Sequence, residues 1–169
     1  MISKKMEMSI NEQINREIFS AYLYLGMASY TASEGFSGVS NWFNVQVQEE
    51  LAHAQIMYNY VIQQNGRVIM KAIEEPPQDF KSVLDLFEKT LEHERKVTAF
   101  IYGLVDIARK ENDHATEIFL QWFVSEQVEE ESSASDMVNK LKMAGDSENT
   151  LLMIDKDLAQ RVFNPPKTK

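Results

Sequence analysis

The placement of proline is the feature that most constrains the fold of this chain. All four prolines stand in two adjacent pairs, Pro76-Pro77 and Pro165-Pro166. Because proline breaks the interior of a helix, the proline-free spans on either side of residue 76 permit long helices. No segment shows the sustained polar and apolar alternation of a half-buried strand. The sequence therefore predicts an all-helical protein.

Apolar periodicity and the positions of glycine divide the chain into helices. Ser3 and Asp79 are the expected N-caps of the first and third helices, because a short polar side chain can accept a hydrogen bond from the first turn. Gly66 and Gly145 are the expected C-terminal stops of the second and fourth helices. The predicted helices lie near residues 4–33, 39–65, 80–110, 113–144 and, as a short fifth, 148–161.

The connections between these helices predict the topology. Short links near residues 34–38 and 111–112 imply antiparallel neighbours. Residues 66–79 lack strong periodicity, and an extended segment of this length spans roughly 46 Å, whereas the second helix is roughly 40 Å long. We therefore expect a four-helix bundle with one long crossover between helices 2 and 3 and a short C-terminal fifth helix. It forms one domain, residues 1–163, followed by a short tail, residues 164–169.

Composition excludes several classes of function. The net charge of −9 argues against binding to a phosphate backbone. The absence of cysteine excludes a disulfide framework, a thiolate metal site and a thiol nucleophile. No apolar run approaches the roughly 18 residues of a membrane span, and the start MISKKMEMS lacks the apolar core of a signal peptide. We expect a cytoplasmic protein with neither a nucleic acid nor a membrane as partner.

One glutamate interrupts the apolar stripe of each long helix near its middle. Steps of three and four residues along the four helices meet Glu17, Glu50, Glu94 and Glu130 in turn. Lysine and arginine are absent from the central part of all four stripes. Four carboxylates in a bundle interior without a cation are strongly disfavoured, or forced to take up protons. Two divalent metal ions would balance their charge.

The residue types around these glutamates narrow the choice of metal. Glu50 and His53 lie on one helix face at i, i+3, and Gln127 and Glu130 repeat that spacing. Carboxylates with one imidazole suit iron or manganese, although zinc and copper would also bind. Di-iron carboxylate bundles use a Glu from each of two helices and Glu-x-x-His from each of the others. This chain has Glu-x-x-His once, and QVEE takes the second place.

At these residues the sequence resembles the ferritins, specifically the non-haem ferritins of bacteria and archaea. The resemblance covers nearly the whole chain and is carried by NREIFSAYLYL, NWFNVQVQEELAHA, LEHERKV and FLQWFVSEQVEEE. It implies an iron-storage protein with ferroxidase activity, which oxidises Fe(II) with dioxygen or peroxide and stores Fe(III) as a mineral. It also implies a homo-oligomeric shell of 24 subunits.

The resemblance implies metal ligands residue by residue. Glu17, Glu50 and His53 correspond to the first iron site of a ferroxidase centre. Glu50, Glu94 and Glu130 correspond to the second, with Glu50 bridging the two ions. Two iron ions per subunit are therefore expected at this centre.

Further roles are implied for residues around the centre. Gln127 resembles a residue that can orient dioxygen or water, and Tyr24 one that can supply an electron, with Trp122 close by. Core packing is the alternative for Tyr24 and Trp122, and a solvated acidic face is the alternative for a third iron site. His93 and His114 fall outside the inner stripes and are expected on the surface. The third iron site would use Glu49, Glu126, Glu129 and Glu130.

Other helical proteins fit the sequence less well. A bacterioferritin would carry two Glu-x-x-His motifs and a haem-binding methionine where this chain has Leu51, so no haem is expected. A rubrerythrin would need cysteine pairs, and a mini-ferritin would lack the fifth helix read in LLMIDKDLAQ. A substrate-oxidising di-iron oxygenase is usually longer. A non-metal bundle serving structure or interaction would carry apolar residues in place of the four glutamates.

Overall fold

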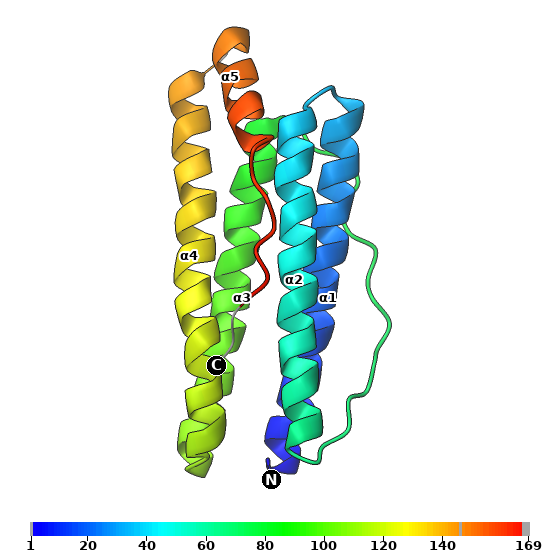
Figure 1. Ribbon diagram of the computed structural model, residues 1–169, viewed down its shortest axis with the longest axis vertical. Coiled ribbons are helices and arrows are strands. Elements are labelled where there is room, and N and C mark those ends of the chain that lie inside the picture. Colours follow the sequence, from blue (N-terminus) through cyan, green and yellow to red (C-terminus); the bar gives the residue numbers. More distant parts are fainter. Residues whose placement is uncertain (1, 146, 167–169) are drawn as a thin grey trace.

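Four long helices run up, down, down and up, and a short fifth helix crosses one end of them (Figure 1). The computed structural model describes residues 2–145 and 147–166, and every regular element within these ranges is helical. The predicted all-α bundle is therefore confirmed, with boundaries shifted by a few residues. The helices are α1 (Lys4–Ser33), α2 (Ser37–Gln63), α3 (Val83–Glu111), α4 (His114–Ala144) and α5 (Glu148–Leu158).

The N-terminal caps agree with the sequence in one helix and differ in another. Ser3 caps α1 as predicted, because its side chain accepts a hydrogen bond from the backbone N–H of Met6 at 3.0 Å. The prediction of Asp79 for α3 is wrong. The cap is Ser82, whose Oγ accepts from the N–H of Asp85 at 3.1 Å. The Asp85 carboxylate in turn accepts from the N–H of Lys81 at 3.0 Å. With this pair of bonds the helix begins at Val83 and not at Phe80.

Of the two predicted C-terminal stops, one is confirmed and the other is wrong. Gly145 ends α4 with a φ of +53°, as expected for a glycine stop. At the end of α2 the left-handed residue is Asn65, with a φ of +58°, and not Gly66. Asparagine tolerates this conformation because its short side chain bonds locally. Gly66 follows it and donates its N–H to the carbonyl oxygen of Val61 at 2.9 Å.

The fifth helix ends at Leu158, three residues before the predicted end. From there an extended segment turns back along α2 (Figure 1). The Asn41 side chain donates to the carbonyl oxygens of Leu158 at 3.1 Å and Arg161 at 2.9 Å, which stabilises the turn away from the helix. The predicted tail, 164–169, is described only as far as residue 166, so its last three residues lie outside the described part of the chain.

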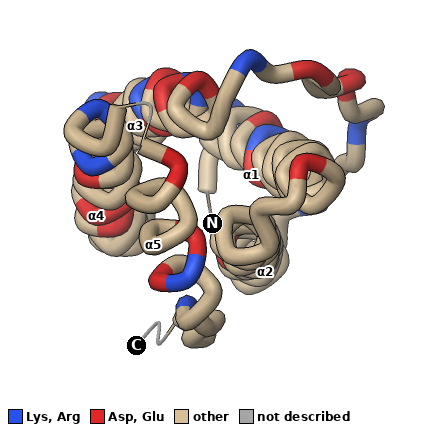
Figure 2. Tube along the Cα trace, turned by 90° about the horizontal axis from the view of Figure 1, so that it is seen from above, with Lys and Arg blue, Asp and Glu red and all other residues tan. Residues whose placement is uncertain are grey.

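The long crossover between α2 and α3, residues 64–82, runs along the outer side of α1 (Figures 1 and 2). Side chains of α1 bind its backbone at several points. The Asn11 amide donates to the carbonyl oxygen of Arg67 at 3.0 Å and accepts from the N–H of Ile69 at 2.7 Å. The predicted crossover is confirmed, and it allows α2 and α3 to run in the same direction.

The bundle interior holds two apolar clusters rather than one. Pairs of helices pack closely along their length, α1 with α2 and α3 with α4 (Figure 2). One cluster, near the chain's N-terminus, includes Ile10 and Met57, and the other includes Phe43 and Phe87 near α5. The polar positions of all four stripes fall between the two clusters. No helix of the described residues carries an apolar stretch long enough to cross a lipid bilayer.

Candidate metal centre

A layer of buried polar side chains separates the two apolar clusters. Each member lies on an inner stripe, so the helical period alone turns it towards the bundle axis. The structure brings together all six residues predicted for the inner centre, and each is at most 7% exposed. They are Glu17 of α1, Glu50 and His53 of α2, Glu94 of α3, and Gln127 and Glu130 of α4.

Three of these side chains form a compact group on α1 and α2. Nδ1 of His53 lies 3.7 Å from Oε2 of Glu50 and 4.0 Å from Oε2 of Glu17. One ligand atom from each lies within 4.8 Å of the others. Metal–ligand bonds are roughly 2 Å long, so this spacing leaves room for one ion between the three atoms. Gln13 donates to the other oxygen of Glu17 at 2.8 Å and fixes that carboxylate.

Glu94 is held from two sides. The Tyr24 hydroxyl donates to its Oε1, and the Gln127 amide donates to its Oε2 at 3.3 Å. Burial, and then the charge of Glu130, raise the pKa of Glu94 to about 8, even though both hydrogen bonds act in the opposite direction. Without a metal ion, this carboxyl therefore carries a proton at neutral pH.

Two more carboxylates of the layer are shifted in the same direction. Burial, followed by the charge of Glu94, raises the pKa of Glu50 well above its usual value. Burial also raises the pKa of Glu130, although the Gln46 amide donates to its Oε2 at 3.0 Å. The metal-free layer thus holds protons that a cation would displace.

The layer contains buried polar atoms that its own residues leave unsatisfied. Within the described ranges, Nε2 of His53 and Oε1 of Gln46 are buried without a hydrogen-bond partner. Likewise no lysine or arginine there pairs with Glu17, Glu50 or Glu94. Buried charges in proteins are paired or bind metal ions. Carboxylate oxygens with one imidazole nitrogen form a donor set that suits iron.

The outer acidic residues are only partly brought together. Oε1 of Glu126 lies 3.9 Å from Nε2 of His53, and these two residues form a second close group with Glu130. Glu126 is half-buried, whereas Glu129 is exposed. Of the predicted third site, Glu126 and Glu130 therefore face the centre, and Glu129 faces outwards.

The remaining outer residue, Glu49, is paired with a residue that sequence reasoning missed. Nη2 of Arg161 donates to Oε2 of Glu49 at 2.6 Å. Arg161 follows α5 and belongs to no inner stripe, so periodicity gave no signal for it. Gln46 was also missed as a partner of Glu130, although it lies one turn before Glu50 on the same stripe.

Comparison with known proteins identifies the family. The family described as a Ferritin-like domain matches residues 8–144. The chain belongs to the ferritin family. Its predicted resemblance, its ferritin-like fold and iron storage as its function are thereby confirmed.

Individual ferritins are similar over nearly their whole length. The chain is 45% identical over 161 residues to the bacterial non-heme ferritin of Bacteroides fragilis, which covers 95% of this chain and 100% of the relative. For that of Staphylococcus aureus the identity is 40% over 164 residues, covering 97% and 99%. A closed form of the Archaeoglobus fulgidus ferritin, engineered by mutagenesis, is 52% identical with a TM-score of 0.96, covering 97% and 100%. The open pore ferritin of the same archaeon is also 52% identical, with a TM-score of 0.95, covering 96% and 100%.

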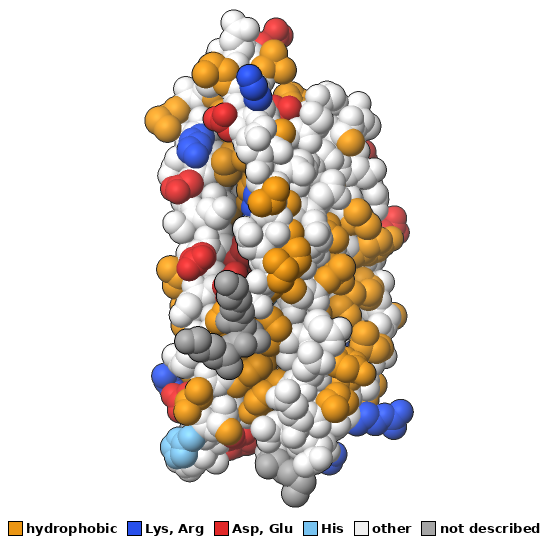
Figure 3. Space-filling model, in the orientation of Figure 1, with side chains coloured by type: hydrophobic (Ala, Val, Ile, Leu, Met, Phe, Trp, Pro, Cys, Tyr) orange, Lys and Arg blue, Asp and Glu red, His pale blue; other side chains and the backbone are white. Residues whose placement is uncertain are grey.

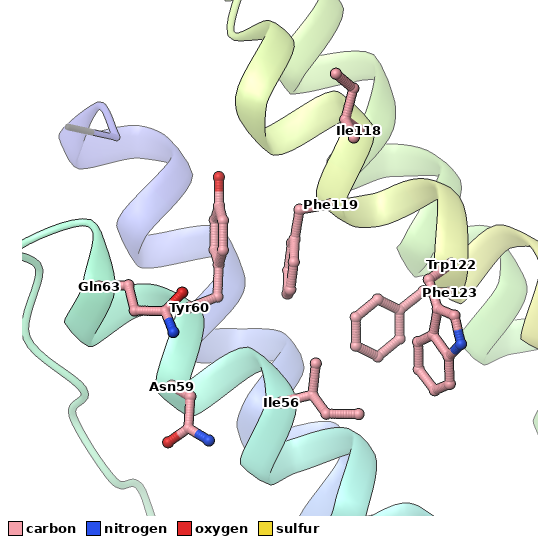
Figure 4. Close-up of a pocket in the computed structure, with 8 residues that line it drawn as sticks. All are labelled: Ile56, Asn59, Tyr60, Gln63, Ile118, Phe119, Trp122 and Phe123. Carbon is pink, nitrogen blue, oxygen red and sulfur yellow. The ribbon is translucent and has the colours of Figure 1, made fainter. Parts of the chain in front are cut away.

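Two aromatic residues of this ferritin contact the layer from opposite sides. The fully buried Tyr24 stacks on Phe43 at 5.9 Å between ring centroids. The Trp122 ring meets the His53 ring edge-on at 5.5 Å. A pocket of about 410 Å³ between α2 and α4 begins at Trp122 and Phe123, and Figure 4 shows these rings at one side of its lining.

His93 corrects one expectation for this ferritin. It was predicted on the surface, but it is half-buried between α1 and α3 and shares a hydrogen bond of 2.7 Å with Oγ of Ser20. Burial lowers its pKa to about 4, so it is neutral at pH 7. The prediction failed because the contact between α1 and α3 is wider than the inner stripe. His114 is exposed, as expected.

Proposed function

We propose that this ferritin is a ferroxidase that oxidises Fe(II) at the buried polar layer before the iron is stored. The observation that carries the proposal is the burial of Glu17, Glu50, Glu94 and Glu130 at one level of four different helices. Burying four carboxylates lowers the stability of a metal-free bundle. A site for cations gives that arrangement a function.

Each of the two iron positions has its own ligand set. The first ion binds Glu17, Glu50 and His53, in line with the close approach of their ligand atoms. The second binds Glu50, Glu94 and Glu130. The charges of Glu94 and Glu130 raise the pKa of Glu50, and the charge of Glu130 raises that of Glu94. Glu50 belongs to both sets and bridges the ions.

The residues around the ions divide the remaining tasks. Two Fe(II) ions release two electrons, enough to reduce one dioxygen to peroxide or one peroxide to water. Gln127 donates to Glu94 and can orient the oxidant beside the second ion. Tyr24 and Trp122 each contact a proposed ligand, which supports a role for Tyr24 as an additional electron source.

A third iron position lies on the outer side of the layer. Glu126 and Glu130 support it most directly, because both approach His53 in a close group. Glu49 and Glu129 complete its predicted ligand set.

The protein acts as a shell of identical subunits, for which we propose 24 copies. Apolar side chains gather on the outer face of α2 and its neighbour α1, as Figure 3 shows. Burying such a surface favours association. The chain's likeness to open-pore and closed-form ferritins supports a hollow assembly. A cytoplasmic location stays a prediction from the sequence.

The test is an aerobic Fe(II) titration of metal-free protein, followed by ferric absorbance in the near ultraviolet. We expect a fast phase that saturates near two iron ions per chain and is lost in Glu94→Gln. Glu92→Gln is the matched control, because Glu92 is an exposed partner of Lys96 on the same helix. Oxidation no faster than in buffer, or unaffected by Glu94→Gln, would overturn the proposal.

A further inference from the structure

The segment that follows α5 brings a cation to the edge of the metal centre. Besides its bond to Glu49, Arg161 donates from Nη1 to the carbonyl oxygen of Trp42 at 3.2 Å. Its guanidinium group also lies 4.6 Å from the centre of the Trp42 ring. Asn41 holds the backbone of the same residue. Arg161 is therefore fixed to α2 at four points and is not a loosely placed surface side chain.

The charge of Arg161 acts on the outer side of the centre. Among the described residues, it is the one lysine or arginine that pairs with any of Glu49, Glu126, Glu129 and Glu130. Its pair with Glu49 is largely withdrawn from water, with side chains 25% and 19% exposed. Its charge also reaches Glu130, the residue shared by the second and third iron positions.

We propose that Arg161 is a tethered counter-ion that withholds Glu49 from the third iron position and so keeps that position weaker than the two inner ones. The inference rests on the proposed ferroxidase centre and adds a residue that sets how many ions the centre holds. Arg161 acts through Glu49 and is a positioning residue.

Two effects oppose a third ion. The guanidinium group already uses Oε2 of Glu49, so an ion must displace it to gain that ligand. Arginine stays charged at any physiological pH. Because Trp42 and Asn41 still hold the displaced residue, its charge would remain close and repel the ion. The first inner position is spared, because Glu17, Glu50 and His53 have no partner of this kind in the described part of the chain.

The experiment is anaerobic equilibrium dialysis of Fe(II) against the metal-free protein, with bound iron counted per chain. In the wild type we expect two tightly bound ions and a weaker third. Arg161→Gln should raise the affinity for the third Fe(II) by about three- to tenfold, the scale of a partly buried ion pair. The double variant Arg161→Gln with Glu49→Gln should lose that gain, because the released ligand is gone. The affinity of the first inner position should stay unchanged in Arg161→Gln, and that of the second, which shares Glu130 with the third, should change less than the third.

Matched variants separate the role of Arg161 from general charge and from packing. Arg67→Gln makes the same charge change at an exposed position of the crossover and should leave the third ion unchanged. Arg161→Lys keeps the charge and should keep the binding of the third ion weak. Arg161→Met keeps an apolar stem against Trp42 and should tighten the third ion even if Arg161→Gln folds poorly.

The outcomes distinguish this inference from the proposed function. Unchanged third-ion affinity in both Arg161→Gln and Arg161→Met would overturn the role of Arg161 and leave the two inner sites intact. An equal gain in Arg67→Gln would also overturn it. Absence of the two tight ions in the wild type would instead refute the ferroxidase centre itself.

Discussion

The hydroxyl of Tyr24 in α1 donates a hydrogen bond to Oε1 of Glu94 in α3, across the middle of the bundle. The Gln127 amide of α4 holds the other oxygen at 3.3 Å. The Glu94 carboxylate is therefore oriented before any ion arrives. A carboxylate oriented in advance loses less conformational freedom on binding a cation, which favours binding and fast reaction.

Tyr24→Phe tests this orientation. The change removes one hydrogen bond that stabilises the ionised form of Glu94, so the pKa of that carboxyl should rise further and the second iron should bind more weakly. We expect the fast phase of Fe(II) oxidation to slow by about three- to tenfold, the scale of the net contribution of one ordinary hydrogen bond. Stopped-flow absorbance measures the rate.

The control for this variant is Tyr30→Phe. Tyr30 also donates its hydroxyl to an acceptor, the carbonyl oxygen of Phe80 at 2.7 Å, but at the end of the bundle near α5. Its loss should leave the oxidation rate unchanged. Equal rates in wild type and Tyr24→Phe would show that the hydrogen bond to Glu94 has no part in the reaction.

Glu94→Gln should stabilise the metal-free protein at high pH while removing its activity. The folded-state pKa of Glu94 is about 8, raised from 4.5, so the folded state binds a proton that the unfolded state has lost. Metal-free stability is thus highest below about pH 4.5 and falls as pH rises through 8. At pH 8.5 we expect the variant to be more stable by about 2 kcal/mol or more.

Denaturant unfolding at equal protein concentration measures this difference, since assembly changes apparent stability. At pH 5 the two proteins should differ much less, because Glu94 is protonated in the folded wild type and partly protonated in the unfolded chain. A difference that does not grow between pH 5 and pH 8.5 would contradict the raised pKa of Glu94.

Iron binding should release protons. Glu94 is protonated at pH 7 without metal, because its pKa is about 8; burial also raises the pKa of Glu50, and a cation binds only the ionised forms. Anaerobic calorimetry in two buffers of different ionisation enthalpy should give about one proton or more per chain at pH 7. Above pH 8 the number should fall, and apparent affinity should rise from pH 6 to pH 8. Glu94→Gln should release about one proton fewer, and an unchanged number would contradict the assignment.

The sequence predicted the fold and the inner layer because both follow from the fixed period of the α-helix. Proline pairs left the long spans in which helices could form, and steps of three and four residues put Glu17, Glu50, Glu94 and Glu130 on the inner faces. Each lies near the middle of its helix, so antiparallel packing brought them to one level. No knowledge of individual contacts was needed.

Contacts between distant segments were beyond this reasoning. The start of α3 depends on a pair of bonds around Ser82, and the end of α5 depends on Asn41, more than 100 positions earlier. The burial of His93 depends on the width of one helix contact, and the reach of Arg161 depends on where α5 ends. None of these leaves a periodic trace in the sequence.

Gly38→Ala should release α5 from α2. A Cβ at Gly38 would lie 1.6 Å from the carbonyl oxygen of Asp155, so the two backbones approach more closely than any side chain allows. The backbone N–H of Val39 also donates a hydrogen bond to the Asp155 carboxylate at 2.8 Å. No residue of α5 is fully buried, and its remaining apolar contacts come from the partly buried Leu151, Ile154 and Leu158. We expect limited proteolysis within residues 147–161 to become at least about tenfold faster, which corresponds to roughly 1.4 kcal/mol of lost docking.

Gly103→Ala is the control, because no atom lies within 4 Å of a Cβ at Gly103 in α3. Alanine inside a helix should raise stability by about 0.5–1 kcal/mol there and leave proteolysis of the C-terminal segment unchanged.

Gly38→Ala also tests the role of Arg161 independently. If α5 fixes the position of Arg161, the release of α5 should raise the affinity for the third Fe(II), as Arg161→Gln does. Faster proteolysis with an unchanged third affinity would mean that Asn41 and Trp42 hold Arg161 on α2 without help from α5.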